Sequence, residues 1–206
     1  MKNETPTVFI IDDDDAVRGS LRLLLKSYGL ETQLCASAEE FLANHDPDRP
    51  GCIVLDVRMP GMSGIELQQK LNARGATIPI VFITGHGDVP MAVEAMQAGA
   101  FDFLQKPFDD NDLIARVQRA IEHNATQRAR HHTRQDTRER LGTLTPRERD
   151  VLDLVVVGKA NKVIAADLGL SQRTVEIHRA RVMEKMDAAS LAQLVRMVLD
   201  LEREGD

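Results

Sequence analysis

Acidic residues follow two short apolar runs near the start of the sequence. Thr7–Ile11 is followed by Asp12 and Asp13, and Cys52–Leu55 is followed by Asp56. Carboxylates that converge in this way bind hard divalent cations, and Mg²⁺ prefers a few carboxylates together with waters and phosphate oxygens. The spacing therefore predicts a Mg²⁺ site formed by the residues that end these two runs.

A hydroxyl and an ammonium group follow the same pattern later in the chain. Thr84 closes an apolar run that starts at Ile80, and Lys106 follows the run Phe101–Leu104. These groups can bind the oxygens of a phosphoryl group carried by Asp56, because phosphoryl transfer depends chiefly on positioning and charge neutralisation. We therefore expect the carboxylates, the hydroxyl and the ammonium to form one phosphoryl-acceptor site.

Other interpretations of these residues are weaker. Asp12–Asp15 alone would suit a solvated acidic cap beside a helix N-terminus, but the matching positions of Asp56, Thr84 and Lys106 disfavour this. An EF-hand is excluded, since the carboxylates are consecutive and no pattern of glycine and glutamate follows. His86 is a candidate phosphate carrier, but its glycine neighbours favour a surface loop.

Residues 1–121 alternate between strand-like and helix-like segments. Capping boxes at Ser37-x-x-Glu40 and Ser63-x-x-Glu66 mark two helix starts, and a further helix is predicted over 88–98. Five strands separated by helices predict an open parallel α/β sheet, in which ligands bind beyond the carboxyl ends of the strands. The predicted strands are 7–12, 31–35, 52–56, 80–84 and 101–104.

Charge is distributed unevenly along the 206 residues, whose net charge is −6. Residues 1–121 hold 11 basic and 18 acidic side chains, for −7, whereas residues 122–140 hold 5 and 3, for +2. Because residues 122–140 have no apolar periodicity, we expect a charged linker that is a solvated helix or partly disordered. Residues 141–206 then form a second domain, in which 159–185 carry a net charge of +3.

Four helix signals follow in residues 141–206. Thr145 and Glu148 form a capping box with proline at the first helical position, and Ser171 is the expected N-cap of a helix that reaches about Met186. Side chains at spacings of three and four on that helix share a face that we expect to pack in the core. They are Val175, His178, Val182 and Met186.

The opposite face of the same helix mixes charged and small apolar side chains. Its members are Arg173, Glu176, Ile177, Ala180, Arg181 and Glu184. An outward isoleucine and alanine between arginines suit a DNA major groove, where apolar groups meet thymine methyls, glutamate accepts from cytosine and arginine reaches phosphates. The alternative is an ordinary solvated helix of mixed charge.

Four segments of the first domain closely resemble the response-regulator receiver family: Ile11–Asp13, Leu55–Gly64, Ile83–Gly85 and Leu104–Phe108. The resemblance covers about residues 6–125, and the run Thr84–Val93 is similar to the FixJ-like subgroup. It implies a flavodoxin-like, doubly wound α/β fold with five parallel strands in the order 2-1-3-4-5.

The same resemblance implies a role for each residue of the acidic site. Asp56 would accept the phosphoryl group, while Thr84 and Lys106 would contact it. The implied Mg²⁺ ligands are Asp12, Asp13, Asp56 and the backbone carbonyl of Arg58. Phe103 would be the rotating switch aromatic, with a simple core role as the alternative. The Lys106–Pro107 peptide bond would be cis, aiming the lysine inward.

Residues 144–201 resemble the LuxR/NarL-type helix-turn-helix family, which implies an all-α, four-helix DNA-binding domain. The matching residues include Leu144–Arg149, Asn161-Lys162, Ile164-Ala165, Thr174-Val175, His178 and Lys185-Met186. The family reads bases from three positions after the helix threonine, which here are Glu176, Ile177 and Ala180. The phosphate contacts are expected from Lys162, Arg173, Arg181 and Lys185, and Thr174 belongs to the same DNA-binding set.

These features predict a DNA-binding transcriptional response regulator, which is not an enzyme. A partner histidine kinase would phosphorylate Asp56, and phosphorylation would promote a homodimer that binds double-stranded promoter DNA. RNA polymerase is left open as a further partner. Two other classes are a phosphorelay carrier or enzyme regulator whose C-terminal helices bind protein, and a receiver-controlled RNA binder. With aromatics at 3%, the chain lacks stacking residues for RNA.

The sequence favours a cytoplasmic protein without a membrane partner. No apolar run reaches the ~18 residues that a membrane span needs, and the start lacks a signal-peptide core. Cys35 and Cys52 lie in apolar runs without metal-ligand spacing. We therefore expect them to be buried thiols in a reducing cytoplasm.

Overall fold

The computed structural model describes residues 5–85 and 89–202 of the chain. The candidate phosphate carrier His86 and Asp88, the predicted start of the helix over 88–98, lie outside these residues. The chain divides into two compact units, Met1–Arg128 and Ala129–Asp206, and each is described by itself. Among the described residues, no helix is both long enough and apolar enough to cross a membrane.

The first unit contains a five-stranded parallel sheet in the order β2-β1-β3-β4-β5. The predicted doubly wound topology is therefore confirmed. The strands are β1 (Thr7–Ile11), β2 (Glu31–Cys35), β3 (Gly51–Asp56), β4 (Ile80–Thr84) and β5 (Asp102–Gln105).

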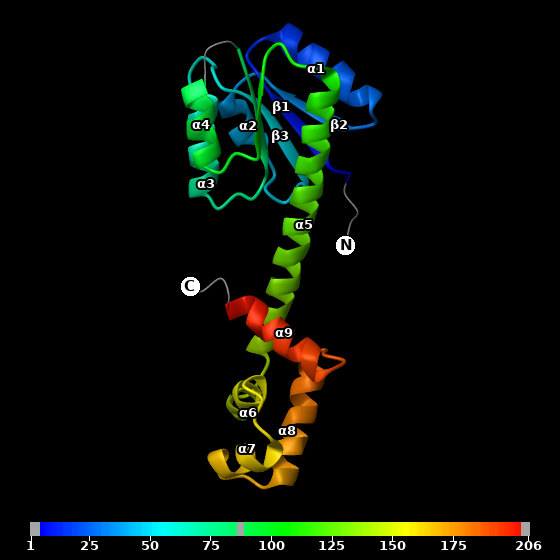
Figure 1. Cartoon of the computed structure of the whole chain (residues 1–206), viewed down its shortest axis with the longest axis vertical. Helices are drawn as coiled ribbons and strands as arrows, with labels where there is room; N and C mark the ends of the chain where they lie inside the picture. The colour runs from blue at the N-terminus through cyan, green and yellow to red at the C-terminus, as the bar shows by residue number, and fades with distance from the viewer. Residues whose placement is uncertain (1–4, 86–88, 203–206) are drawn as a thin grey trace. The chain divides into compact units, whose positions relative to one another are not determined.

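Helices cover both faces of this sheet (Figure 1), with α1 and α5 on one face and α2, α3 and α4 on the other. Alternate residues of β1 point to opposite faces, so Phe9 and Ile11 pack in one core and Val8 and Ile10 in the other. Burial on both faces explains why the strands are continuous apolar runs. The helices are α1 (Asp15–Ser27), α2 (Ala38–Asn44), α3 (Gly64–Ala73), α4 (Val89–Gln97) and α5 (Asp110–Gly142).

One of the two predicted capping boxes in this unit is only half formed. At α3, Ser63 and Glu66 make both reciprocal hydrogen bonds. At α2, the Ser37 hydroxyl accepts from the Glu40 amide, but the Glu40 carboxylate accepts from the Ala36 amide at 2.6 Å. The prediction of a complete box at Ser37 was wrong, because the carboxylate binds one residue before the cap.

The second unit is helical and has its own core of buried residues, including Leu152, Ile164, Val175 and Leu194. Thr145 forms the predicted capping box with Glu148, and Ser171 caps α8 by accepting from the Thr174 amide. After α5 the chain forms α6 (Pro146–Val156), α7 (Asn161–Leu168), α8 (Gln172–Lys185) and α9 (Leu191–Glu202).

Both cysteines are buried thiols. Burial raises the pKa of Cys35 to about 11 and that of Cys52 to about 12, because a thiolate is poorly solvated inside the fold. Cys35 ends β2 and Cys52 lies in β3. Both therefore act as small core side chains.

Candidate functional site

Asp12, Asp56 and Lys106 meet at the carboxyl edge of the sheet. Strands β1 and β3 are neighbours with Ile11 opposite Leu55, which places the two aspartates at adjacent strand ends. The Lys106 ammonium donates hydrogen bonds to Asp12 Oδ2 at 2.9 Å and to Asp56 Oδ1 at 2.8 Å. The convergence expected from three separate segments is present in the structure.

Backbone groups hold both carboxylates in place. The Arg58 amide donates to Asp56 Oδ2 at 2.8 Å, and the Asp14 amide donates to Asp12 Oδ1 at 2.9 Å. Asp12 is 2% exposed and Asp56 is 8% exposed. Within the described part of the chain, each oxygen of Asp56 thus accepts at least one hydrogen bond, and a small part of the residue stays exposed.

Burial and ion pairing shift the pKa values of Asp56 and Lys106 in opposite directions. Burial raises the pKa of Asp56, although the hydrogen bond and charge of Lys106 and the Arg58 amide oppose this effect. Burial alone would lower the pKa of Lys106, but the hydrogen bonds and charges of Asp56 and Asp12 outweigh it and raise that pKa. The lysine therefore stays charged between two carboxylates.

The structure also places Thr84, Phe103 and Asp13, which belong to the predicted site. Thr84, 2% exposed, ends β4 one residue beyond Ile83, which lies opposite Asp56. The Lys106–Pro107 peptide bond is cis. Phe103 on β5 is partly buried and packs against the core on the α2–α4 side of the sheet. Asp13 is exposed beside the site.

The described residues contain no cluster of three or more His, Cys, Asp or Glu side chains arranged to hold a metal ion. Asp12 and Asp56 are both paired with Lys106. Two buried carboxylates at adjacent strand ends are nevertheless donors that suit Mg²⁺, since this ion keeps several waters and needs few protein ligands. The chemistry of the residues present fits a divalent cation.

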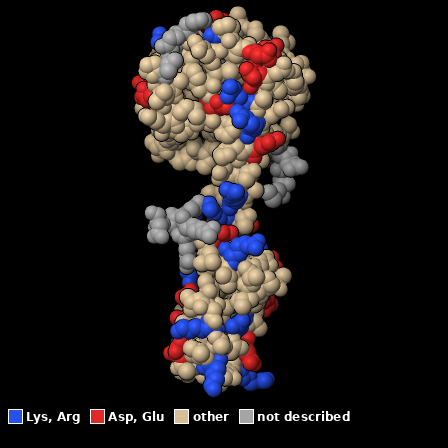
Figure 2. Space-filling view, in the orientation of Figure 1, with Lys and Arg blue, Asp and Glu red and all other residues tan. Residues whose placement is uncertain are grey.

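In the second unit, α8 has the two faces that its sequence predicts. Val175, Val182 and Met186 are buried and His178 is half-buried. The opposite face is exposed, and its isoleucine, Ile177, is 47% exposed. The exposed members of that face are Arg173, Glu176, Ile177, Ala180, Arg181 and Glu184. Figure 2 shows Lys and Arg side chains interspersed with Asp and Glu on the face of this unit that it draws.

The structure gives Lys185 a different position from the other candidate DNA contacts. Its ammonium donates to Glu148 Oε2 at 2.6 Å and to the Thr143 carbonyl at 3.1 Å. Lys162 is exposed at the start of α7, whereas Thr174 shares its hydroxyl hydrogen bond with Ser171 at the start of α8. Lys185 therefore stays a predicted phosphate contact, and it differs from the others in that its ammonium is already paired with a buried carboxylate.

Glu148 is a residue whose full role sequence reasoning missed. It is 2% exposed, and its carboxylate accepts from the Thr145 amide as well as from Lys185. The Lys185 hydrogen bond, helped by the Thr145 amide, lowers the pKa of Glu148 to about 2. The capping box signals half of this arrangement, but its partner lies 37 residues away on another helix.

The fold and the two sites define a response regulator with a helix-turn-helix output domain. Residues 8–118 match the response regulator receiver domain family, and residues 142–198 match the luxR family of bacterial regulatory proteins. The chain belongs to these families, and their combination is that of a two-component transcriptional regulator.

Several relatives are similar to this chain over nearly its whole length. The transcriptional regulatory protein FixJ of Azorhizobium caulinodans is 55% identical over 95% of this chain and 93% of its own. The FixJ of Rhizobium meliloti is 52% identical over 94% and 95%. Among solved structures, the response regulator StyR has a TM-score of 0.85 and 47% identity, covering 94% of this chain and 98% of its own.

Proposed function

We propose that Asp56 accepts a phosphoryl group from a partner histidine kinase and that this modification controls the binding of promoter DNA. The observation that carries the proposal is the shared lysine: Lys106 binds Asp56 and Asp12 at once beside the buried Thr84. Because the output is DNA binding, the activity belongs in the cytoplasm. The protein acts as a switch, with no substrate turnover of its own beyond slow loss of the phosphoryl group.

The chemistry follows from the charges at the site. An Asp56 oxygen attacks the phosphorus, the bond from phosphorus to the donor nitrogen breaks, and that nitrogen keeps the electron pair and takes up a proton. The new acyl phosphate brings negative charge, which Lys106 offsets and the Thr84 hydroxyl stabilises by donating a hydrogen bond. Asp12, Asp13, Asp56 and the Arg58 carbonyl would hold Mg²⁺, which neutralises phosphoryl oxygens when bound.

We propose that the exposed face of α8 reads DNA. Glu176, Ile177 and Ala180 suit base edges in a major groove, while Arg173, Arg181 and Lys162 suit phosphates. One helix-turn-helix covers a small footprint, so two copies on neighbouring half-sites bind more tightly than one. Phosphorylation would therefore act by promoting a dimer.

The proposed receiver dimer uses the face of α4 and β5. On α4, Val93 is 51% exposed and Met96 is 45% exposed, and Phe103 lies in the adjacent strand β5. Apolar side chains grouped on an exposed face mark interaction sites. Sedimentation of the protein with and without a phosphodonor tests this face: Val93→Asp should remain monomeric when the parent dimerises. A parent that stays monomeric at tens of micromolar with full phosphoryl uptake would rule out the dimer.

The acceptor itself is tested by intact mass. The protein is treated with a small phosphodonor and Mg²⁺ beside an Asp56→Asn variant, and both are then titrated with promoter DNA. We expect one phosphoryl group on the parent, none on the variant, and an affinity gain in the parent alone. Undiminished uptake by the variant would falsify the assignment of Asp56.

A further inference from the structure

Helix α5 remains attached to the first unit beyond the residue at which the linker was expected to begin. Its inward stripe starts with Leu113, Val117 and Ala120, which are fully buried. The next position of that stripe is Asn124, which is 2% exposed although its immediate neighbours are exposed. The stripe continues in the same direction and changes from apolar to polar.

Asn124 joins the start of β3 to the segment that precedes β4 at the amino edge of the sheet. Its Oδ1 accepts from the Gly51 amide at 3.1 Å, and its Nδ2 donates to the Thr77 carbonyl at 3.5 Å. Gly51 begins β3, where a Cβ atom would lie 1.8 Å from the Thr7 carbonyl oxygen, so no other residue fits. The amide therefore fixes α5 to a closely packed point of the β1–β3 pair.

Arg128 makes a second attachment one turn later. Its guanidinium donates to the Pro47 carbonyl at 3.3 Å and to the Asp48 carbonyl. Arg49 in the same loop donates to the Thr7 hydroxyl at 3.0 Å. The loop between α2 and β3 is thus bound on one side by β1 and on the other by α5.

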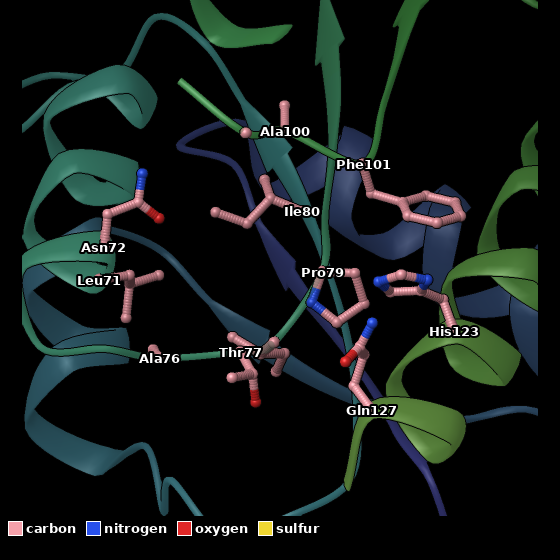
Figure 3. Close-up of a pocket in the computed structure, with 12 residues that line it drawn as sticks. Leu71, Asn72, Ala76, Thr77, Pro79, Ile80, Ala100, Phe101, His123 and Gln127 are labelled. Carbon is pink, nitrogen blue, oxygen red and sulfur yellow. The ribbon is translucent and has the colours of Figure 1, made fainter. Parts of the chain in front are cut away.

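The same part of α5 lines a pocket of about 450 Å³ through His123 and Gln127. Figure 3 shows His123 and Gln127 on α5 facing Thr77, Pro79 and Phe101. The His123 and Phe101 ring centroids are 5.3 Å apart. His123 and Gln127 lie on the same side of α5 as Asn124 and Arg128. This side of the helix packs against the rest of the first unit.

We propose that Asn124 and Arg128 form a clasp by which the receiver holds the start of the helix that leads to the DNA-binding unit. A polar helical segment of this length is marginal by itself, so the clasp keeps residues 122–128 helical and makes them part of the receiver. The second half of the proposal rests on the proposed function: the effect of Asp56 phosphorylation on DNA affinity requires the clasp. The clasp and Asp56 lie at opposite ends of β3.

The test uses the full chain and three variants. Arg128→Ala removes two charged hydrogen bonds, and Asn124→Asp keeps the size and the Gly51 contact but cannot donate to Thr77. Arg130→Ala, an exposed position on the next turn, is the matched control. Hydrogen exchange of amides 122–130, phosphoryl uptake at Asp56, and the affinity gain for promoter DNA on phosphorylation are measured for each.

We expect exchange to rise about tenfold in Arg128→Ala and to rise in Asn124→Asp, with the control unchanged. Phosphoryl uptake should be normal in all three, and the affinity gain should shrink in the two clasp variants alone. Unchanged exchange in both clasp variants overturns the clasp, and faster exchange with a full affinity gain overturns its part in signalling. If the parent itself shows no affinity gain, the proposed function fails, and the exchange data still decide whether the clasp exists.

Discussion

The Lys185 ammonium at the end of α8 lies 2.6 Å from the Glu148 carboxylate at the start of α6. This ion pair connects α8 to α6 within the second unit. Its carboxylate is nearly inaccessible, while the lysine remains partly exposed. The pair therefore fixes the position of the helix that we expect to enter the major groove.

The Glu148 pKa predicts how the second unit responds to acid. Because the pKa is lowered to about 2 from an ordinary 4.5, its contribution is complete above about pH 4.5 and is lost as the pH falls toward 2. Glu148→Gln should lower stability at pH 7 by about 1–3 kcal/mol, the range for losing charged hydrogen bonds to a buried group. Thermal melts of both proteins at pH 7 and pH 3 check this. An equal difference between them at the two pH values would contradict the assignment.

Removing the Asp13 side chain should weaken Mg²⁺ binding without changing which residue accepts the phosphoryl group. Its side chain is exposed beside the paired Asp12 and Asp56, so Asp13→Ala leaves their pairing with Lys106 intact. We expect the variant to keep Asp56 as the acceptor but to lose most of the Mg²⁺ dependence of phosphoryl uptake. Intact mass at a series of Mg²⁺ concentrations measures this, with Asp15→Ala as the control because Asp15 belongs to the same acidic run. A Mg²⁺ response identical to that of the parent would remove Asp13 from the ligand set.

The exposed residues of α8 should not respond alike to mutation. Losing a base-edge contact costs ~1–3 kcal/mol on the cognate site and little on random DNA, whereas losing a phosphate contact weakens all sequences and lowers the salt slope by about one. Glu176→Ala should therefore relax preference at one base per half-site. Arg181→Ala should reduce affinity without changing preference. Selection from a randomised operator library at two salt concentrations distinguishes the two effects.

His178 is the control for the orientation of that helix. It is half-buried, and its Nδ1 atom is buried without a hydrogen-bond partner among residues 5–85 and 89–202. His178→Ala should loosen the unit, seen as a lower melting temperature, without changing base preference. If a fully stable His178→Ala altered the preference while Glu176→Ala kept it, α8 would present a different face to DNA.

His45 makes the first unit sensitive to mildly acidic pH. Its ring stacks on Phe41 with centroids 4.5 Å apart and meets Phe9 edge-on at 5.2 Å. Burial lowers the pKa of His45 below its ordinary 6.5, although Asp46 opposes this. The unfolded chain thus binds a proton more readily, so stability falls as the pH drops below about 6.5. His45→Phe should flatten the change in melting temperature between pH 7 and pH 5; a parent whose melting temperature is constant over that range would disprove the effect.

Most of the fold is predictable because its signals are local. Apolar runs that end in Asp12, Asp56 and Thr84 indicate the strands, and they also indicate that these three side chains lie at the carboxyl edge of the sheet. The two faces of α8 follow from side-chain spacing in the same way. Asn124 and Arg128 escaped prediction because a polar stripe can face inward when it binds backbone groups, and hydrophobic periodicity detects only apolar stripes. The Glu148–Lys185 pair escaped because pairing between helices depends on their packing.

The two buried cysteines have a practical consequence for following the folding of this chain. With the pKa of Cys35 at about 11 and that of Cys52 at about 12, almost no thiolate exists near neutral pH, and only the thiolate reacts with alkylating reagents. Neither thiol becomes reactive until the sheet around it opens. The rate at which an alkylating reagent labels the native chain therefore reports how often the receiver unfolds, with no engineered probe.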